Sequence, residues 1–402
     1  MGDPDDVRFE AVAAHMHHIR SLDLHLIPTS YTFTMPSRAY TAFNTTAPVL
    51  QFLSFSKHRD VGHDGRPLVH SNFGISEHTM PRLSSLQLHG IEMTTTLCQQ
   101  IQSLRTFSFS FCDRSWYDDI SLERSFSEHL RNLTTINVEL AGWNASQGCP
   151  QLGSSVKHVN IRWTRRGLFI PRDTVPNQTA WNSMRAIRVT HMCRSSADLL
   201  AVTTPLTAFA IPGTIAPYQT LSLRTSGAPN TRVHARATDC EDRERVFCGL
   251  HPSTIAGMVA NIPGQMLSTI TITAAAVALR AFLDAECPVL SCIRLVLDTD
   301  DIAWIDSFAR DMPNIKTLER LEFIRVGDSA APNWTTATMI RVVSCCIGAG
   351  NKLREVLFLG FSPEAQCCAL VDMFSQQVVI NQDWREPKSD WAWFTEPPFE
   401  WQ

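Results

Sequence analysis

A short apolar motif recurs along most of this 402-residue chain. It consists of an apolar residue, two residues of any kind, an apolar residue, one residue of any kind, and a third apolar residue. The first clear copy is Ile19-Arg-Ser-Leu22-Asp-Leu24, and later copies begin at Leu50, Leu83, Leu104, Leu133, Val156, Met184, Leu206, Leu267, Leu290, Leu318 and Leu353. Because a repeat restricts the possible architectures more than any other pattern does, the motif is the strongest constraint on the fold.

The spacing of the motif indicates what the repeated unit is. The last two apolar positions lie two residues apart, so their side chains share one face if the motif forms a strand. Third positions from Leu24 to Ile211 follow at intervals of 21 to 33 residues, and those from Ile272 to Phe358 at intervals of 23 to 35. These intervals scatter around the ~20–29 residues of a leucine-rich repeat. We therefore predict an α/β fold, an irregular leucine-rich-repeat solenoid (horseshoe) with parallel strands on the concave face and helices or irregular returns on the convex face.

Several segments between the motifs have the pattern of amphipathic helices. Thr335 or Thr336 can begin a helix that carries Met339, Ile340, Val343 and Ile347 on one face and stops near Gly348. Further helices are predicted within 119–133, 253–262, 274–286, 302–312 and 365–377. Strands that alternate with helices favour an α/β solenoid.

One interval, from Ile211 to Ile272, is too long for a single repeat. It contains two short alternating runs, Leu221-Ser-Leu223 and Val233-His-Ala235, on either side of a turn-rich stretch at 226–230. We expect an atypical strand pair or an insertion at about 212–250, either a hairpin or short atypical repeats. Since a solenoid grows by adding units, we predict that residues 1–382 form a single solenoid.

The C-terminal tail, residues 383–402, is rich in tryptophan and phenylalanine. Terminal repeats need a cover for their apolar faces, so we predict that the tail is a cap over the last repeats. An exposed aromatic recognition segment is the alternative.

Charge and composition exclude several classes of protein. The chain has 35 basic and 39 acidic residues and a net charge of −4, which gives no basic field for nucleic acid. Its N-terminus lacks the apolar core of a secretory signal, and no apolar stretch is long enough to span a bilayer. We therefore expect a cytoplasmic or nuclear protein, not a secreted one, whose 12 cysteines are reduced and mostly buried.

No group of residues has the pattern of a catalytic, cofactor or metal site. His15-Met-His17-His18 has no cysteine or carboxylate at ligand spacing and is interpreted as a helix end or loop. Asp298-Thr-Asp300-Asp301 follows a strand and precedes a helix, where a helix cap is expected. Residues 348–352 lack the full phosphate-loop motif, and no Cys-x-x-Cys occurs. We predict no enzymatic activity, no cofactor and no metal.

The residues on either side of the third apolar position point away from the core. They are polar in the early copies and become apolar in the late ones, as at Val296, Ile324, Leu357 and Leu359, and an apolar end to such a face needs a partner or a cover. We predict that this face binds a protein partner. The candidate partner-binding residues are Asp23, His25, Gln87, His89, Asn137, Glu139, Asn160, Arg162, Arg188, Arg294 and Glu322.

Three segments also carry a resemblance to a known family: His18-Ile-Arg-Ser-Leu-Asp-Leu24, Met80-Pro-Arg-Leu-Ser-Ser-Leu-Gln-Leu-His-Gly90, and Asp242-Arg-Glu-Arg-Val-Phe247 with Gly249-Leu250. The chain resembles, over nearly its whole length, the leucine-rich C-terminal part of the large F-box families of mushroom-type fungi. That resemblance implies a substrate receptor of an SCF-type ubiquitin ligase, with the repeats selecting the target. Residues 1–18 are too short for an F-box, so a ligase adaptor is an expected partner only if an F-box is supplied elsewhere.

Two classes of function follow. The favoured one is a non-enzymatic protein-interaction module whose target proteins are unknown. The alternative is an enzyme that acts on polysaccharide and is built as a parallel β-helix. The alternative predicts helix-free rungs of constant length and stacked carboxylates on one face.

Overall fold

The computed structural model describes residues 4–26, 44–57, 75–89, 95–111, 128–140, 154–163, 184–191, 218–226, 232–250, 267–273, 287–296, 316–324, 335–348, 352–359, 371, 373–374 and 376–383. The chain divides into two compact units, Met1–Arg194 (unit 1) and Ser195–Gln402 (unit 2). Each unit is described by itself, and the single solenoid over 1–382 stays a prediction.

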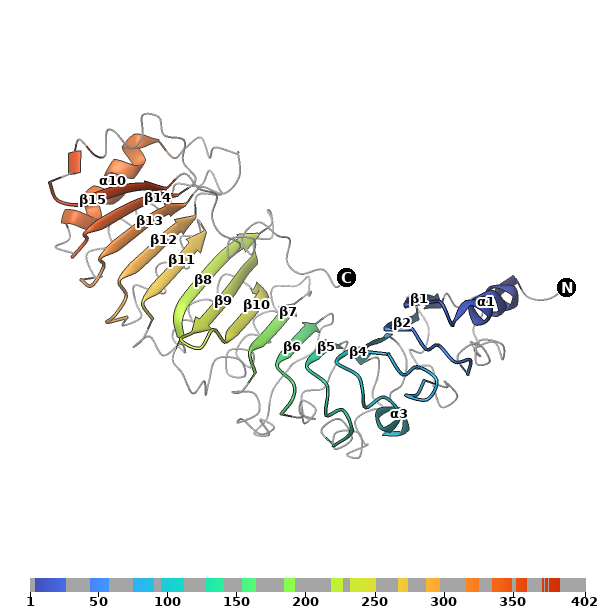
Figure 1. The fold of residues 1–402 in the computed structure, drawn as a ribbon. Helices are drawn as coiled ribbons and strands as arrows, with labels where there is room; N and C mark the ends of the chain where they lie inside the picture. Colours follow the sequence, from blue (N-terminus) through green and yellow to red (C-terminus); the bar gives the residue numbers. More distant parts are fainter. Residues whose placement is uncertain are drawn as a thin grey trace. The chain divides into compact units, whose positions relative to one another are not determined.

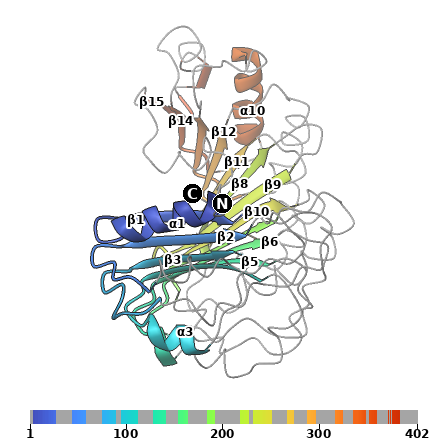
Figure 2. The same ribbon diagram turned by 90° about the vertical axis from the view of Figure 1, so that its right-hand side faces the viewer.

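Seven parallel strands run through unit 1 and pair in the order of the sequence (Figure 1). Two described helices accompany them: α1 (Pro4–His15) precedes the first strand, and α3 (Thr95–Gln100) lies between the third and the fourth. In the view of Figure 2 the first strands lie one above another as successive rungs. The strands are β1 (Ser21–Leu26), β2 (Phe52–Lys57), β3 (Ser85–His89), β4 (Thr106–Phe111), β5 (Thr135–Leu140), β6 (His158–Trp163) and β7 (Ala186–His191).

The apolar motif determines the register of unit 1. The second and the third apolar positions of every copy pair with their equivalents on the next strand. The second positions form the row Leu22, Leu53, Leu86, Phe107, Ile136, Val159 and Ile187, and all of these side chains are buried. A one-residue slip would turn the whole row into solvent, so burial of this row fixes the pairing.

A tight turn precedes each of the first five strands and adds a fourth apolar position to the motif. The backbone N–H of the first apolar position donates to a carbonyl three residues earlier, as in Leu50 to Ala47 at 3.2 Å and Leu104 to Ile101 at 3.1 Å. The residues that supply these carbonyls are all buried: Met16, Ala47, Met80, Ile101 and Leu130. The repeated unit therefore begins three residues before the first apolar position of the motif.

Unit 2 has eight described strands, in the spatial order β10-β9-β8-β11-β12-β13-β14-β15 (Figure 1). The strands from β11 onward, and β8 against β11, pair in parallel, whereas β8, β9 and β10 pair antiparallel. Their bounds are β8 (Tyr218–Ser226), β9 (Arg232–Asp239), β10 (Glu244–Leu250), β11 (Thr269–Thr273), β12 (Cys292–Val296), β13 (Arg320–Ile324), β14 (Glu355–Leu359) and β15 (Val379–Asp383).

The antiparallel strands fall in the interval that is too long for one repeat. The two alternating runs lie in β8 and β9, and β10 is a third strand that the sequence patterns did not indicate. Leu221 and Leu223 of β8 pair in register with Ile270 and Ile272 of β11. Strand β8 therefore serves both as a repeat strand and as the first strand of an antiparallel meander.

The predicted helix near residue 336 is present as α10 (Thr336–Gly348). The hydroxyl of Thr335 accepts the N–H of Thr338 at 3.3 Å, which caps the helix. Its buried face consists of Met339, Val342 and Val343. Ile340 and Ile347, which we expected on that face, are only half-buried, because Val342 occupies the position between Met339 and Val343 on the helix surface.

Several predictions fall on residues outside the described ranges. They are the motif copy at 206–211, the helices within 253–262, 274–286 and 302–312, the acidic segment 298–301 and the tail beyond Asp383. Of the helix predicted within 365–377, the described residues 371, 373 and 374 are helical, and β15 follows as an unexpected further strand. Both units therefore have mostly parallel strands in an unclosed sheet, while the horseshoe curvature and the convex helices stay predictions.

Candidate functional site

The register of unit 1 places nine of the predicted residues in two rows on the sheet face opposite the apolar rows; we call these two rows the unit 1 strip. Serines fill most of the places between them. The first row is Asp23, Ser54, Gln87, Ser108, Asn137, Asn160 and Arg188. The second row is His25, Ser56, His89, Ser110, Glu139, Arg162 and Thr190.

Hydrogen bonds run across three strands in the middle of the first row. The Asn160 side chain donates from Nδ2 to Asn137 Oδ1 at 2.7 Å, and Asn137 donates from Nδ2 to Ser108 Oγ at 2.8 Å. An amide carries both donors and an acceptor, so one asparagine per strand can continue such a ladder across neighbouring strands about 4.8 Å apart. Ser108 is buried and both asparagines are half-buried, so the ladder holds these side chains in one orientation.

Asp23 and His25 form a local contact at the start of the strip. His25 Nε2 lies 3.2 Å from Asp23 Oδ2, and its Nδ1 is hydrogen-bonded to the hydroxyl of Ser56 on β2. This order of groups is that of a hydrolase triad. However, the aspartate of such a triad is buried, whereas the His25 and Asp23 side chains are 69% and 51% exposed. We interpret the contact as polar pairing on an open sheet face.

The remaining predicted residues of unit 1 are Gln87, His89, Glu139, Arg162 and Arg188, which occupy the two rows by register. Gln87, His89 and Arg188 are half-buried. Glu139 and Arg162 pair in register on β5 and β6, but their side chains lie outside the described residues.

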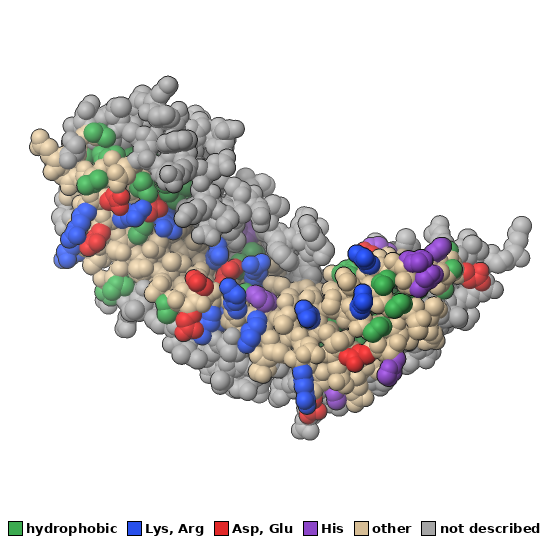
Figure 3. Space-filling model, viewed as in Figure 1, with side chains coloured by type: hydrophobic (Ala, Val, Ile, Leu, Met, Phe, Trp, Pro, Cys, Tyr) green, Lys and Arg blue, Asp and Glu red, His purple; other side chains and the backbone are tan. Residues whose placement is uncertain are grey.

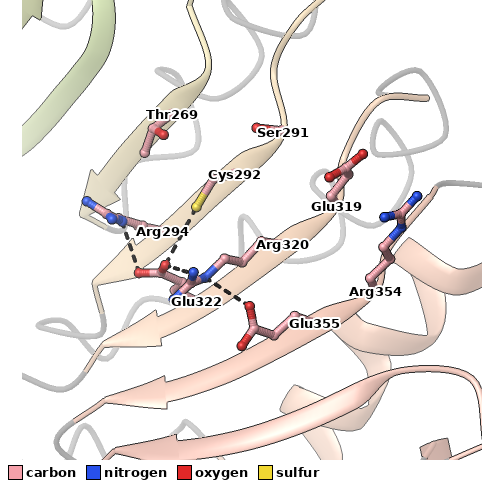
Figure 4. A pocket seen from close by; sticks show the side chains of 9 residues that line it. All are labelled: Thr269, Ser291, Cys292, Arg294, Glu319, Arg320, Glu322, Arg354 and Glu355. Atoms are coloured by element: carbon pink, nitrogen blue, oxygen red, sulfur yellow. Dashed lines mark hydrogen bonds and ion pairs between the residues drawn. The ribbon is translucent and has the colours of Figure 1, made fainter.

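Arg294 and Glu322, the two predicted residues of unit 2, form the centre of a charged cluster (Figure 4). The Glu322 side chain is 3% exposed and lies on β13 between two arginines. Its Oε2 is 2.9 Å from Arg294 Nε, and its Oε1 is 2.7 Å from Arg320 Nε. The second carboxylate, Glu355, lies 3.4 Å from Arg320 Nε and accepts a hydrogen bond from Asn381 at 2.7 Å.

Arg320 and Glu355 were not among the predicted residues. They stand directly before the second apolar position of their motifs, and Arg320 pairs in register with Glu355 and with Cys292. Because side chains alternate along a strand, this position shares a face with Glu322 two residues later. Extending the strip by one position toward the start of each strand would have identified both residues.

The cluster lines a pocket of about 430 Å³ (Figure 4). Opposite charges also gather over β12 to β14 in the space-filling view (Figure 3). The lining residues are Thr269, Ser291, Cys292, Arg294, Glu319, Arg320, Glu322, Arg354 and Glu355. Three arginines therefore face three glutamates in this pocket.

Cys292 lines the pocket beside Glu322. Its thiol lies 3.7 Å from Glu322 Oε1. Burial and then the Glu322 carboxylate raise the pKa of Cys292 to about 12. The thiolate, which is the reactive form of cysteine, is therefore disfavoured at neutral pH.

The apolar end of the predicted strip is withdrawn from solvent. Val296 and Ile324 pair in register beyond the charged cluster, and both are buried although they lie on the face opposite the core rows. Leu357 and Leu359 are half-buried. The role of residues 383–402 as their cap stays a prediction.

The described residues include free thiols, but no metal-ligand cluster and no helix that could span a membrane. They contain no group of three or more His, Cys, Asp or Glu side chains that could hold a metal ion. Six cysteines of the described ranges are free thiols, of which Cys98, Cys248 and Cys292 are buried and Cys240 is exposed. None of the helices in the described ranges is long and apolar enough to cross a membrane.

Comparisons with known proteins give a distant likeness among solved structures. No family model matches the chain, and no curated protein matches it. Among solved structures, the crystal structure of the leucine-rich repeat-containing protein LegL7 from Legionella pneumophila is similar with a TM-score of 0.33 and 11% sequence identity. That match covers 81% of this chain and 98% of the LegL7 chain. At this TM-score we draw no conclusion about function from it.

Proposed function

We propose that this protein is a non-enzymatic protein-interaction module that binds a partner protein through the unit 1 strip. The amide ladder from Ser108 through Asn137 to Asn160 carries the proposal. Side chains fixed in this way lose little conformational entropy when a partner binds, and sheet strands hold them in place. The target protein, and a cytoplasmic or nuclear location, remain predictions.

Two features of the fold speak against the polysaccharide-active β-helix. That alternative requires rungs without helices, but α3 lies between β3 and β4, and α10 lies between β13 and β14. It also requires stacked carboxylates on one face. In unit 2 the neighbours of Glu322 along its row are Arg294 and Leu357, so no such stack surrounds it.

The proposal is tested by comparing the proteins that co-purify with the wild type and with a strip variant. The double substitution Asn137→Leu and Asn160→Leu removes the ladder and replaces it with apolar groups of similar size. We expect recovery of the specific partner to fall at least tenfold, because truncation of central interface residues costs about 1–2 kcal/mol each. Quantitative mass spectrometry of the eluates measures the recovery.

Lys157→Gln is the matched control, because the Lys157 side chain is exposed and donates from Nζ to the nearby Ser154 carbonyl at 3.1 Å. It should leave recovery unchanged. Equal recovery of every protein by the wild type and the double variant, with both folded by circular dichroism, would show that the strip is not the binding surface.

A narrower form of the proposal follows from the sequence resemblance to fungal F-box proteins. In that form the repeats select targets for an SCF-type ubiquitin ligase, and the adaptor binds only when an F-box is present. Affinity purification with and without an F-box fused at the N-terminus tests this. We expect both forms to recover the same specific target, and only the fused form to recover the adaptor. A fused form that recovers the adaptor but no specific target would refute the ligase-receptor proposal.

A further inference from the structure

We propose that the pocket between β11 and β14 binds a single carboxylate of the partner protein, an Asp or Glu side chain or a chain terminus, through Arg320 and Arg354. This inference rests on the proposed function, because it names the chemical group that a protein partner would present to unit 2. The pocket and all its lining residues lie within unit 2.

Two of the three carboxylates that line the pocket, those of Glu322 and Glu355, already have partners. Both Glu322 oxygens contact an arginine Nε, and both Glu355 oxygens are occupied, by Asn381 and by Arg320. A lysine side chain could approach Glu319, but it would have to break these contacts to reach Glu322 or Glu355. The buried position of Glu322 makes that exchange costly, since a buried charge that loses its partner is strongly destabilising.

The arginine N–H donors of Arg320 and Arg354 are less fully paired than these carboxylates. Arg320 contacts both glutamates through Nε, which is buried, yet its side chain is 42% exposed. The ion pairs of Arg320 with Glu322 and Glu355 are formed through Nε, so the Nη groups lie outside these two contacts. Arg354 also lines the pocket and is exposed, and no carboxylate in the described ranges forms an ion pair with it. A guanidinium offers five N–H donors in a planar fork that matches a carboxylate.

The charge balance of the pocket favours a carboxylate over a phosphate. Glu319, Glu322 and Glu355 all line the pocket. A phosphate group carries up to two negative charges at neutral pH, so it meets more repulsion from these carboxylates than a single carboxylate does. The fork of Arg320 is also held in place by Glu322 and Glu355, which prepares it for a planar ligand.

A purely structural cluster would explain the pairing of Glu322, but not the position of the exposed Arg354 at the pocket. Buried ion pairs are often no more stabilising than apolar residues of similar volume. Arg354 contributes no ion pair to the cluster in the described ranges, yet it stands at the pocket. Its substitution therefore separates binding from folding.

The test uses the full-length protein and peptides. A library of random dodecapeptides is selected on the immobilised wild type, and the most enriched peptide is synthesised with each Asp or Glu changed in turn to its amide or to phosphoserine. Binding is measured by fluorescence polarisation against the wild type, Arg354→Gln, Arg320→Gln and Asn137→Leu/Asn160→Leu. Lys352→Gln is the control, since Lys352 is exposed and does not line the pocket.

We expect one carboxylate of the peptide to be essential. Its amide should bind at least tenfold more weakly, and Arg354→Gln should weaken binding about tenfold with an unchanged melting temperature, since one charge-assisted hydrogen bond accounts for about that factor. Lys352→Gln should change binding less than twofold. Arg320→Gln should weaken binding further.

Three results would overturn the inference: tighter binding of the phosphoserine peptide, enrichment of peptides without any essential carboxylate, or binding that neither arginine substitution changes. If binding is lost only in Asn137→Leu/Asn160→Leu, the carboxylate site is wrong while the proposed function stands. Loss with the arginine variants alone would support the carboxylate site and reject the strip as the main binding surface.

Discussion

At the scale of single residues, the most constrained charges lie in the meander of unit 2. Asp239 accepts the backbone N–H groups of Glu241 and Arg243, both at 2.9 Å, and its Oδ2 lies 2.7 Å from Arg243 Nε. These contacts close the turn between β9 and β10, where Asp242 adopts a φ of 58°. The carboxylate thus replaces the hydrogen bonds that a tight turn leaves unmade.

The protonation of Asp239 should therefore affect stability. Burial alone would raise the pKa of this carboxyl, but the hydrogen bonds from Arg243 and Glu241 outweigh burial and lower it. A carboxyl whose folded pKa is lowered stabilises the protein above its unfolded pKa of about 3.9, and the stabilisation is lost as the pH falls through the folded pKa.

We predict that Asp239→Asn lowers the free energy of unfolding at pH 7 by about 2–4 kcal/mol, because Arg243 then loses its buried partner. The variant should also lose part of the decline in stability that the wild type shows below about pH 4. Urea unfolding between pH 3 and pH 7 measures both. Asp242→Asn is the control, since asparagine tolerates the left-handed conformation at this exposed position; an equal loss in both variants would contradict the prediction.

At the scale of elements, stacking between neighbouring strands adds to the burial of the core rows. Phe323 of β13 and Phe358 of β14 pair in register, and their rings lie 5.1 Å apart at an interplanar angle of 11°. Both side chains are fully buried. Such contacts link one repeat to the next, which is where a solenoid gains its stability.

A double-mutant cycle on this pair should show coupling. Phe323→Ala and Phe358→Ala should each lower the free energy of unfolding by about 3–5 kcal/mol, because each leaves a cavity. The double variant should lose about 0.5–1.5 kcal/mol less than the sum, since the stacking is lost only once. Chemical denaturation measures the cycle. The pair Phe107→Ala and Phe358→Ala, from different units, is the control and should be additive; a coupled control or an additive pair of neighbours would contradict the prediction.

The elements also show where sequence patterns suffice. The motif predicted the register of β1 to β7, because burial of one face leaves a single acceptable pairing. It gave no indication of β10 or β15. In β15 the polar Gln382 stands where the motif has its third apolar residue, and β10 pairs antiparallel with β9, so neither strand needs the motif.

At the scale of the whole molecule, the ends of a repeat protein decide its stability and solubility. Val296 and Ile324 are buried on the strip side of the sheet in unit 2, and the aromatic tail as the cover of the last repeats stays a prediction. The chain has 10 tryptophans, and Trp384, Trp391, Trp393 and Trp401 lie in that tail.

We predict that deletion of residues 390–402 lowers both the melting temperature and the solubility, because apolar surface of the last repeats would become exposed. Each kcal/mol lost should lower the melting temperature by about 2–4 °C. Differential scanning calorimetry measures the melting temperature. The full-length variant Glu396→Gln/Glu400→Gln keeps every aromatic residue and should melt like the wild type; an unchanged melting temperature after the deletion would reject the cap.

The sequence by itself determined the strands that carry the motif, their parallel pairing and the two sides of the sheet, because these depend on a local period-two pattern that burial enforces. Only the tertiary structure decided which polar side chains meet. Asn137 and Asn160 lie 23 residues apart in the chain, and Glu322 and Glu355 share Arg320 across strands separated by a long return. Such contacts depend on the alignment of different repeats, and no single copy of the motif contains that information.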